Sequence, residues 1–339
     1  MAVTIREVAA LAGVSPSTVS RTCKNNPSIS EDTKEKVREA MAKLGYEPNF
    51  QASNLASKNS RTIGIILPAS ERSMYVNSFF LEMIRGITMY CNSHQYITTI
   101  IADETQEDTL QTIRSMIRNG LVNRFILLYS KQKDPVIDYL HKEGVLYALI
   151  GKAYQFANQT IYVDTDNIQA GKDATEYLLQ HGHTRIGFIG YEKTLLFSSD
   201  RRYGYEQAHL EHNHPINPDY LIVVEHTPTQ LPETISRLLN HSNRPTAFVV
   251  ADDFLGIALE HYCQQIGLTV PEDISIISFN NSLFAQLAVP PITSIDINSI
   301  QLGIEAATQI ISHAENPGLA ATKIIIPHRI VKWGSCKKI

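Results

Sequence analysis

The sequence lacks several features that define whole classes of protein. None of its apolar runs reaches the length of about 18 residues that a membrane-spanning helix needs, so no membrane partner is predicted. The first residues have neither the basic start nor the apolar stretch of an export signal, which favours a cytoplasmic location. Cysteine is scarce, and its four residues show no CxxC or Cys/His ligand spacing. Reduced thiols are therefore expected in place of disulfides or a metal site.

The motifs of common enzyme classes are also missing. The chain has no G-x-S-x-G elbow, no Walker-type phosphate loop, no G-x-G-x-x-G fingerprint and no HExxH pair. The neighbouring His209, His212 and His214 are interpreted as a solvated helix end, without a ligand spacing. We therefore predict no catalytic residue, no metal and no cofactor, and an enzyme is a disfavoured alternative.

Charge is distributed unevenly along the chain. Residues 1–61 carry nine Lys and Arg and six Asp and Glu, a balance of +3, whereas the remainder has 21 basic and 28 acidic residues, a balance of −7. A basic end on an acidic body fits a local contact with DNA. Chance asymmetry is the alternative explanation of the charge pattern alone.

The first 50 residues predict three short helices, with a tight turn between the first two. Thr4 and Glu7 have the spacing of a capping box, in which the carboxylate reaches back to the start of the helix. Serines that can cap a helix and glycines that can end one delimit the three segments. These residues are Gly13, Ser15 followed by Pro16, Ser30 and Gly45. The arrangement is typical of a helix-turn-helix.

The stretch from Thr4 to Arg21, TIREVAALAGVSPSTVSR, resembles the headpiece of the lactose-repressor/galactose-repressor family of bacterial transcription regulators. The resemblance implies that the second helix lies in the major groove, with Pro16, Ser17 and Arg21 at base edges. Pro16 offers only apolar contact, whereas Arg21 can bind guanine O6 and N7 together, unless it is an ordinary exposed arginine. The other candidates for DNA contact in the headpiece are Thr4, Ser15, Thr18, Ser20, Asn25 and Tyr46.

A short segment after Pro48 has only marginal helix-forming composition, and a plain flexible linker is one interpretation. The resemblance implies a hinge helix that folds on specific DNA, pairs with its dimer mate in the minor groove and inserts Leu55 as an apolar wedge. Ser53 stands where many relatives carry arginine, so minor-groove contact is expected to be weaker. The candidate contacts of this segment are Asn49, Ala52, Ser53 and Leu55.

From Thr62 onward, apolar strand-like runs alternate with helical patterns, which indicates parallel sheets covered on both faces. The resemblance persists through Val163–Asn167, Gly182–Gly190 and Val270–Ser275, and implies the two-lobed architecture of periplasmic sugar-binding proteins. The predicted fold is an α-helical helix-turn-helix headpiece plus an α/β periplasmic-binding-protein-like body of two doubly wound parallel-sheet lobes. The predicted bounds are 1–48 for the headpiece, 49–61 for the hinge, about 62–162 plus 294–321 for lobe 1, and about 163–293 plus 322–339 for lobe 2.

The resemblance also places a ligand in the cleft between the lobes, at the carboxyl ends of the strands. It assigns Arg201, Asp252 and Asn280 to the effector, and Phe80 and Phe284 are the aromatic side chains chosen to cover an apolar sugar face. Surface or core roles are the alternative for each of them. Asp252 and Asn280 exchange the amide and carboxylate that many relatives carry, which predicts a different pattern of effector hydroxyls.

The segments Ser278–Phe284 and Pro290–Ile297 look most like the maltose-operon repressors of Gram-positive bacteria. We therefore predict a homodimeric repressor that binds a palindromic operator and responds to a small, maltose-like sugar. A regulator of the same family that answers to a nucleobase, a nucleoside or a phosphoprotein is one alternative. A sugar-binding transport protein is another, from a different functional class.

Overall fold

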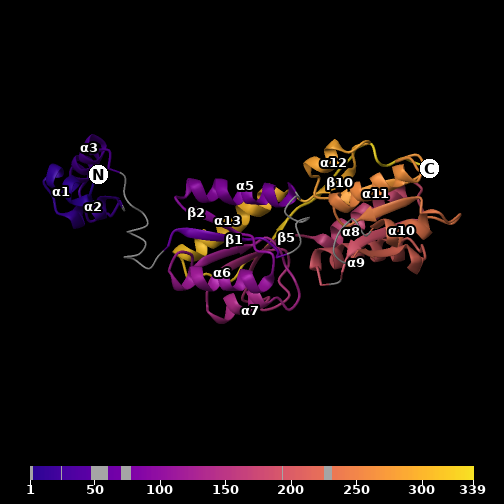
Figure 1. Cartoon of the computed structure of the whole chain (residues 1–339), viewed down its shortest axis with the longest axis horizontal. Helices are drawn as coiled ribbons and strands as arrows, with labels where there is room; N and C mark the ends of the chain where they lie inside the picture. The colour runs from indigo at the N-terminus through magenta and orange to yellow at the C-terminus, as the bar shows by residue number, and fades with distance from the viewer. Residues whose placement is uncertain (1–2, 24, 47–59, 70–77, 193, 225–230) are drawn as a thin grey trace. The chain divides into compact units, whose positions relative to one another are not determined.

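A computed structural model describes residues 3–23, 25–46, 60–69, 78–192, 194–224 and 231–339. The chain divides into two compact units, Met1–Ser60 and Arg61–Ile339, and each is described by itself (Figure 1). Most of the predicted hinge, 49–61, lies outside the described residues. Within the described part of the chain, every helix is too short or too polar to cross a membrane.

Among its described residues, the first unit contains three helices around a small apolar core. Gly13 and Gly45 end the first and third helices with φ of 67° and 62°, a left-handed conformation that costs glycine little. One apolar face of each helix is buried, because Val8, Val19 and Val37 meet in the centre of the unit. The helices are α1 (Ile5–Ala12), α2 (Pro16–Cys23) and α3 (Glu31–Leu44). The two short helices and the turn at Gly13 match the sequence prediction.

The second unit contains two sheets, and the first of them defines lobe 1. All of its strands are parallel, in the order β11-β5-β4-β3-β1-β2. Its strands are β1 (Thr62–Ile66), β2 (Ile97–Ile101), β3 (Arg124–Leu127), β4 (Leu146–Ile150), β5 (Ile161–Thr165) and β11 (Lys323–Ile326). Its helices are α5 (Ser78–Ser93), α6 (Gln106–Arg118), α7 (Pro135–Lys142) and α13 (Ser299–Glu315).

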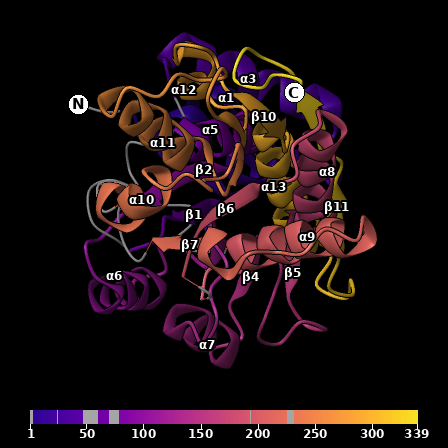
Figure 2. The same cartoon turned by 90° about the vertical axis from the view of Figure 1, so that its right-hand side faces the viewer.

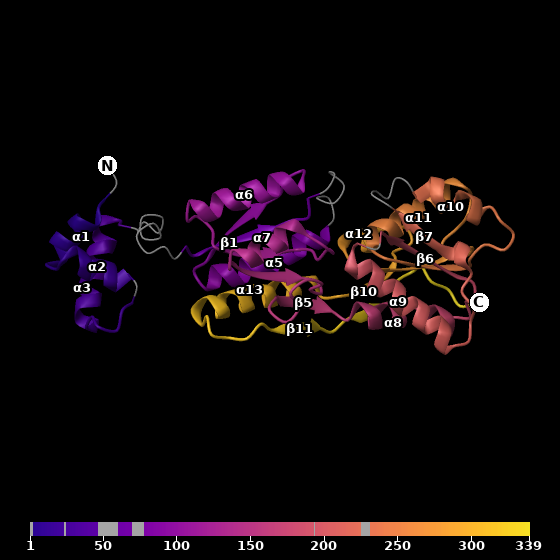
Figure 3. The same cartoon turned by 90° about the horizontal axis from the view of Figure 1, so that it is seen from below.

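Helices cover both faces of this sheet, which explains why its strands are continuous apolar runs. In β3, Ile126 belongs to the cluster that contains side chains of α5 and α13. Its neighbours Phe125 and Leu127 belong to the cluster that contains side chains of α6 and α7. Figure 3 shows α6 on one side of the sheet and α13 on the other. Alternate residues of β3 therefore belong to two separate hydrophobic cores.

The second sheet defines lobe 2, with the order β12-β10-β9-β8-β6-β7. Its pairs are parallel except for β10 with β12, which is antiparallel at one edge. Helices α8 and α9 lie on one face and α10 and α11 on the other (Figure 2). The strands are β6 (Ile186–Tyr191), β7 (Leu221–Val224), β8 (Ala247–Val250), β9 (Ser275–Phe279), β10 (Thr293–Asp296) and β12 (Arg329–Val331). The helices are α8 (Asn167–Gln180), α9 (Leu196–Glu211), the 3-10 helix η1 (Pro218–Tyr220), α10 (Leu231–Leu239), α11 (Asp253–Gln265) and α12 (Leu283–Leu287).

The chain crosses between the sheets three times, and each crossing lies a few residues beyond the predicted lobe bounds. Strand β5 runs to Thr165 and β11 to Ile326, and these two strands pair with each other in lobe 1. Strand β10 runs to Asp296 in lobe 2 before α13 returns to lobe 1. The predicted bounds at 162/163, 293/294 and 321/322 therefore cut strands or preceded them. Pairing between segments far apart in sequence decides these positions, and no local motif reports it.

Two glycines allow α8 and α9 to cross at close range. A Cβ atom on Gly171 would lie 2.1 Å from the carbonyl oxygen of Arg201, and one on Gly204 would lie 1.9 Å from the carbonyl oxygen of Ile168. Larger residues at either position would push the two helices apart. The crossing therefore sets how far Arg201 stands from the residues at the start of α8.

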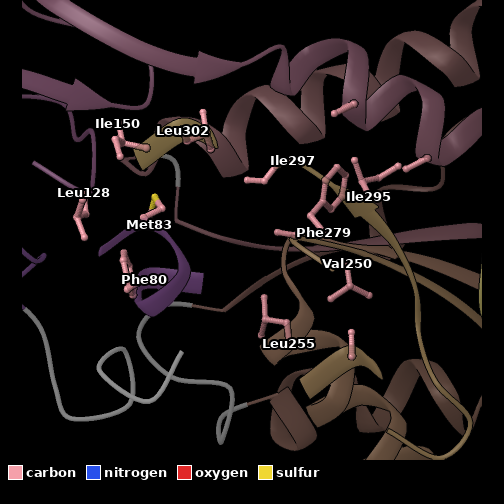
Figure 4. Close-up of a cluster of buried hydrophobic side chains, with 14 of the residues drawn as sticks. Phe80, Met83, Leu128, Ile150, Val250, Leu255, Phe279, Ile295, Ile297 and Leu302 are labelled. Atoms are coloured by element: carbon pink, nitrogen blue, oxygen red, sulfur yellow. The ribbon is translucent and has the colours of Figure 1, made fainter. Parts of the chain in front are cut away.

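Buried apolar side chains of both lobes surround the crossing segments. Figure 4 shows Phe80, Leu128 and Ile150 in lobe 1, and Phe279 and Ile297 in lobe 2. All of these residues belong to one buried cluster. Polar groups that lie beside this cluster are held away from bulk water, which sets the electrostatics of the site described next.

Candidate DNA interface and ligand cavity

The start of α1 is fixed by Thr4 and Glu7. The Glu7 carboxylate accepts hydrogen bonds from the Thr4 backbone N–H at 2.6 Å and from the Thr4 hydroxyl at 2.8 Å. These hydrogen bonds lower the pKa of Glu7, with the backbone bond as the larger cause. The hydrogen bond from the Thr4 backbone to the Glu7 carboxylate, one of the two that define the predicted capping box, is therefore present.

A chain of hydroxyl groups organises the start of α2. The Ser15 hydroxyl accepts a hydrogen bond from the Thr18 N–H at 3.1 Å, which makes Ser15 the cap of this helix. It also lies 2.7 Å from the Ser17 hydroxyl and 2.9 Å from the Thr18 hydroxyl. Pro16 occupies the first helical position, where its missing N–H costs nothing. Ser15, Pro16 and Ser17 are all exposed.

The predicted DNA-contact residues of the headpiece are mostly on its surface. Arg21 and Asn25 are exposed, and Thr18 and Ser20 are partly exposed. Tyr46 is partly buried and packs against the headpiece core, so its ring has a structural role as well. Asn49, Ala52, Ser53 and Leu55 lie outside the described residues. A polar surface of α2 is thus available to a duplex, at the helix that the helix-turn-helix pattern assigns to the major groove.

The second unit contains a cavity of about 500 Å³ between the two sheets. Its lining comes from the carboxyl ends of strands in both lobes, which is where open α/β sheets bind ligands. Lobe 1 contributes residues at or just after the ends of β1, β2, β3, β4 and β5, and lobe 2 contributes residues at or just after the ends of β6, β8, β9 and β10. The volume is in the usual range for a small-molecule site, roughly 300–1,000 Å³.

Arg201 lies at the lobe 2 wall of this cavity and is only 3% exposed. Its Nε donates to Oδ1 of Asn167 at 2.8 Å, and its Nη1 donates to the carbonyl oxygen of Ala251 at 2.5 Å. The guanidinium carbon lies 4.2 Å from the centroid of Phe279, a cation–π distance. Burial lowers the pKa of Arg201 to about 10, so the side chain stays protonated at neutral pH. Arg201 is therefore a buried, fixed cation in the cavity wall.

Asn167 links Arg201 to a buried carboxylate. Its Nδ2 donates to Oδ1 of Asp164 at 3.0 Å, while its Oδ1 accepts from Arg201. The Thr165 N–H also donates to Oδ1 of Asp164, at 2.8 Å. Burial raises the pKa of Asp164 to about 7, although the hydrogen bond from Thr165 and the charge of Arg201 lower it. The sequence prediction missed both Asp164 and Asn167, although they belong to the Val163–Asn167 motif that carried the resemblance.

Asp252 caps α11 and lines the cavity at the same time. Its Oδ1 accepts from the Leu255 N–H at 2.8 Å, and its Oδ2 accepts from the hydroxyl of Tyr191 at 2.9 Å. Burial raises the pKa of Asp252, against the effects of these two hydrogen bonds and of Arg201. The predicted effector residue is thus present in the cavity, with a tyrosine partner that the sequence did not indicate.

Asn280 enters the cavity from the end of β9. Its backbone has φ of 98°, a conformation that few residues other than glycine adopt. Its side chain is buried, and Oδ1 has no hydrogen-bond partner among the described residues. The neighbouring Asp253 holds this loop, because its carboxylate accepts from the Ser282 N–H at 2.6 Å and the Ser294 hydroxyl at 2.8 Å. An unpartnered buried acceptor in a cavity wall is suited to a ligand hydroxyl.

The two predicted aromatic residues have different outcomes. Phe80 lines the cavity from α5, whereas Phe284, on α12, does not belong to its lining. The prediction for Phe284 was wrong because α12 begins three residues beyond Asn280 and leads away from the strand end. The sequence selected none of the other aromatic lining residues, which are Phe79, Tyr129, Tyr191, Phe197 and Phe254. Tyr191 ends β6, and Tyr129, Phe197 and Phe254 follow β3, β6 and β8 within six residues, so nearness to a strand end was the available signal.

Comparisons with known proteins match both the headpiece unit and the unit that contains the cavity. Residues 4–49 match the lacI family of bacterial regulatory proteins, and residues 175–336 match a periplasmic binding protein-like domain. The chain is 34% identical over 336 residues to the HTH-type transcriptional regulator MalR of Streptococcus pneumoniae, which covers 98% of this chain and all of the relative.

Solved structures are similar as well. One, designated a LacI transcriptional regulator from Bacillus cereus subsp. cytotoxis, is 33% identical with a TM-score of 0.79 and covers 83% of this chain and 99% of its own. Another, designated a maltose operon transcriptional repressor from Staphylococcus aureus, is 26% identical with a TM-score of 0.75. It covers 82% of this chain and 98% of its own.

Proposed function

The chain belongs to the lacI family of bacterial regulatory proteins and is a DNA-binding transcriptional regulator, and on that premise we propose that it represses a sugar-utilisation operon and responds to a small maltose-like sugar. The observation that carries the proposal is the cavity whose wall holds Arg201, Asp252 and Oδ1 of Asn280, an oxygen with no hydrogen-bond partner in the described part of the chain. The Arg201 guanidinium has five N–H donors, more than the two hydrogen bonds to Asn167 and Ala251 use, and Asp252 and Asn280 supply acceptors, which is what neighbouring sugar hydroxyls need.

Aromatic faces complete the match to a sugar. Phe79, Phe80 and Tyr129 line the cavity in lobe 1, and Phe197 and Phe254 line it in lobe 2. A pyranose ring has apolar C–H faces beside its hydroxyls, so it needs flat apolar surfaces as well as polar partners. Maltose is favoured over other sugars because the relatives that support this chain's family include MalR proteins and a protein designated a maltose operon repressor.

The headpiece is proposed to bind one half of a palindromic operator. Helix α2 would enter the major groove with Pro16, Ser17 and Arg21 at base edges, and the remaining polar candidates would contact phosphates. Because the operator would lie on DNA in the cytoplasm, we place the protein in the cytoplasm. Leu55 would enter the central base step of the minor groove as a wedge.

A homodimer is proposed because exposed apolar side chains gather on both lobes. On lobe 1, Leu81 and Met89 of α5 and Ile97 and Ile100 of β2 are each more than half exposed. On lobe 2, Leu283, Leu287 and Val289 are similarly exposed at and after α12. Apolar surface of this extent on a folded body is typical of protein interfaces. A dimer would also bring two headpieces to the two half-sites of a palindrome.

Effector binding is proposed to change the angle between the lobes and, through the lobe 1 interface, to remove the support of the hinge segments. For this switch to work, the sugar must bind the low-affinity state more tightly than the operator-bound state. A swing from mostly bound to mostly free requires a difference of roughly 5 kcal/mol.

The deciding experiment is a thermal-shift screen of the purified chain with maltose, maltotriose, glucose, other disaccharides, purines and nucleosides. A ligand at about 100 times its dissociation constant stabilises the folded state by roughly 2.7 kcal/mol. A shift with maltose-type sugars, followed by release of operator DNA, would support the proposal. A shift with purines alone, or none with any sugar, would refute the sugar assignment and favour a nucleobase or a phosphoprotein partner. A sugar-dependent shift without binding to any operator DNA would favour a transport protein.

A further inference from the structure

Charged side chains from both lobes meet in the cavity, and their balance is acidic. Among the described residues that line it, the carboxylates are Glu104, Asp164, Glu192, Asp200 and Asp252, and the cations are Lys131, Lys152 and Arg201. A ligand that carried negative charge would need a cation that these carboxylates do not already occupy.

Lys152, one of the two lining lysines of lobe 1, is paired with a carboxylate of lobe 2. Its Nζ lies 3.6 Å from Oδ2 of Asp200, which belongs to α9 in lobe 2. The Lys152 backbone is fixed as well, because its carbonyl oxygen accepts a hydrogen bond from the Ser130 hydroxyl at 2.5 Å. The Asp200 side chain is 22% exposed and the Lys152 side chain is 52% exposed, so solvent screens this ion pair in part.

The pair stands beside a second connection between the lobes. The N–H of Gln132 donates to the carbonyl oxygen of Thr194 at 3.3 Å, and Lys131 and Leu195 form an isolated antiparallel bridge. Both contacts join the segment after β3 in lobe 1 to the segment before α9 in lobe 2. Asp200, one turn into α9, is therefore held facing Lys152 by backbone contacts at the same side of the cavity.

Lys131, the other lysine of the lining, lies close enough to Asp134 for its charge to lower the pKa of that carboxyl against the effect of burial. Arg201, the buried cation, has partners of its own. Arg201 donates to Asn167 and to the Ala251 carbonyl oxygen, and the carboxylates of Asp164 and Asp252 are close enough to influence it electrostatically. A phosphate placed against Arg201 would therefore also face these carboxylates, and like charges at short range repel strongly in a buried site.

We propose that Asp200 is a specificity-determining residue that restricts the cavity to uncharged ligands, because it occupies Lys152 across the lobes and so denies that ammonium group to a sugar phosphate. This inference deepens the proposed sugar-sensing function and rests on it. It identifies the ligand class as free, neutral saccharides and excludes their phosphorylated forms.

The test compares glucose 6-phosphate with maltose and glucose by isothermal titration calorimetry on the full chain. The wild-type protein is expected to bind glucose 6-phosphate at least about tenfold more weakly than the neutral sugars. Asp200→Asn should bind glucose 6-phosphate at least about tenfold more tightly than wild type, since it frees the Lys152 ammonium group. The double variant Lys152→Gln with Asp200→Asn should lose this gain.

The matched control is Asp219→Asn, which removes one negative charge from an exposed position of lobe 2 outside the cavity. It should leave the affinity for glucose 6-phosphate unchanged. Asp200→Ser is a second variant, in case the asparagine form does not fold, and a thermal unfolding transition like that of the wild type reports that each protein is intact.

Equal affinity of the wild-type protein for glucose and glucose 6-phosphate would overturn the proposal. So would the absence of a gain in both folded Asp200 variants, or a gain that persists without Lys152. If no neutral sugar binds the wild-type protein, the proposed sugar sensing fails. In that case the titrations with glucose 6-phosphate alone still test whether Asp200 excludes charged ligands, so the two failures are distinguishable.

Discussion

The hydroxyl of Tyr191, at the end of β6, donates a hydrogen bond of 2.9 Å to Oδ2 of Asp252, at the start of α11. The bond joins the ends of two strands of lobe 2, β6 and β8, that are hydrogen-bonded neighbours in the sheet. It leaves the Asp252 carboxylate in a defined orientation beside the cavity. A ligand hydroxyl that donates to this carboxylate would find it already aligned, without an ordering cost on binding.

Tyr191→Phe should therefore weaken maltose binding by at least about tenfold, because a hydrogen bond to a charged group contributes roughly 1.5–3 kcal/mol. Calorimetric titration with maltose measures this change. Tyr203→Phe is the matched control, since Tyr203 is half exposed on α9 and has no place in the cavity lining. Equal affinities of Tyr191→Phe and wild type would show that Asp252 does not depend on this contact.

Arg201→Ala should leave DNA binding near normal while abolishing release of the operator by maltose. The guanidinium is the only donor fork among the described lining residues, and it lies in the unit that does not contain the headpiece. Operator binding in the presence and absence of maltose measures both properties. Arg202→Ala, which removes an arginine paired with Glu206 on the same helix, is the control. Unchanged release by maltose would make Arg201 a structural residue.

Asp164→Asn should stabilise the protein at pH 8 more than at pH 5. The pKa of Asp164 is raised by burial from an ordinary 3.8 to about 7 in the folded state. The folded protein therefore binds a proton that the unfolded chain releases, and stability from this group is lost as pH rises from about 4 through 7. An amide keeps an oxygen for the Thr165 N–H and carries no charge. Denaturant unfolding at the two pH values tests this, and an equal effect at both would contradict the assignment.

Arg21→Ala should reduce binding to the specific operator and relax the preference at one base pair. A bidentate contact between arginine and guanine is worth roughly 1–3 kcal/mol of discrimination. Binding to a set of operators with single base changes measures the loss and locates it. Arg38→Ala, an exposed arginine of α3, is the control. A uniform loss on all sequences would assign Arg21 to the phosphates.

Leu55→Ala should weaken binding to the specific operator far more than binding to unrelated DNA. The wedge role follows from the family resemblance, because Leu55 lies outside the described residues. An apolar side chain that enters a base step stabilises only the bent, specific complex. Gel-shift titrations on the two kinds of DNA measure the ratio, with Leu11→Ala as a control at an exposed leucine of α1. Equal losses on both DNAs would refute the wedge.

The sequence predicted the elements whose causes are local. Gly13 and Gly45 end helices, Ser15 and Ser30 cap them, and each does so through neighbours no more than five residues away. The alternation of apolar runs with helical patterns likewise predicted two parallel sheets. Arg201, Asp252 and Asn280 were assigned to the cavity by resemblance and Phe80 by the need of a sugar for a flat apolar face, and all four line the cavity.

Tertiary structure decided everything that depends on distant pairing. The extents of β5 and β11 follow from their hydrogen bonds to each other, across more than 150 residues of chain. The partners of the effector residues are equally remote, since Tyr191 meets Asp252 and Lys152 meets Asp200 only after both sheets have formed. A helix cap depends on a few adjacent residues, and the sequence therefore states it directly. A cavity wall depends on which strand ends become neighbours, and only the folded chain determines that.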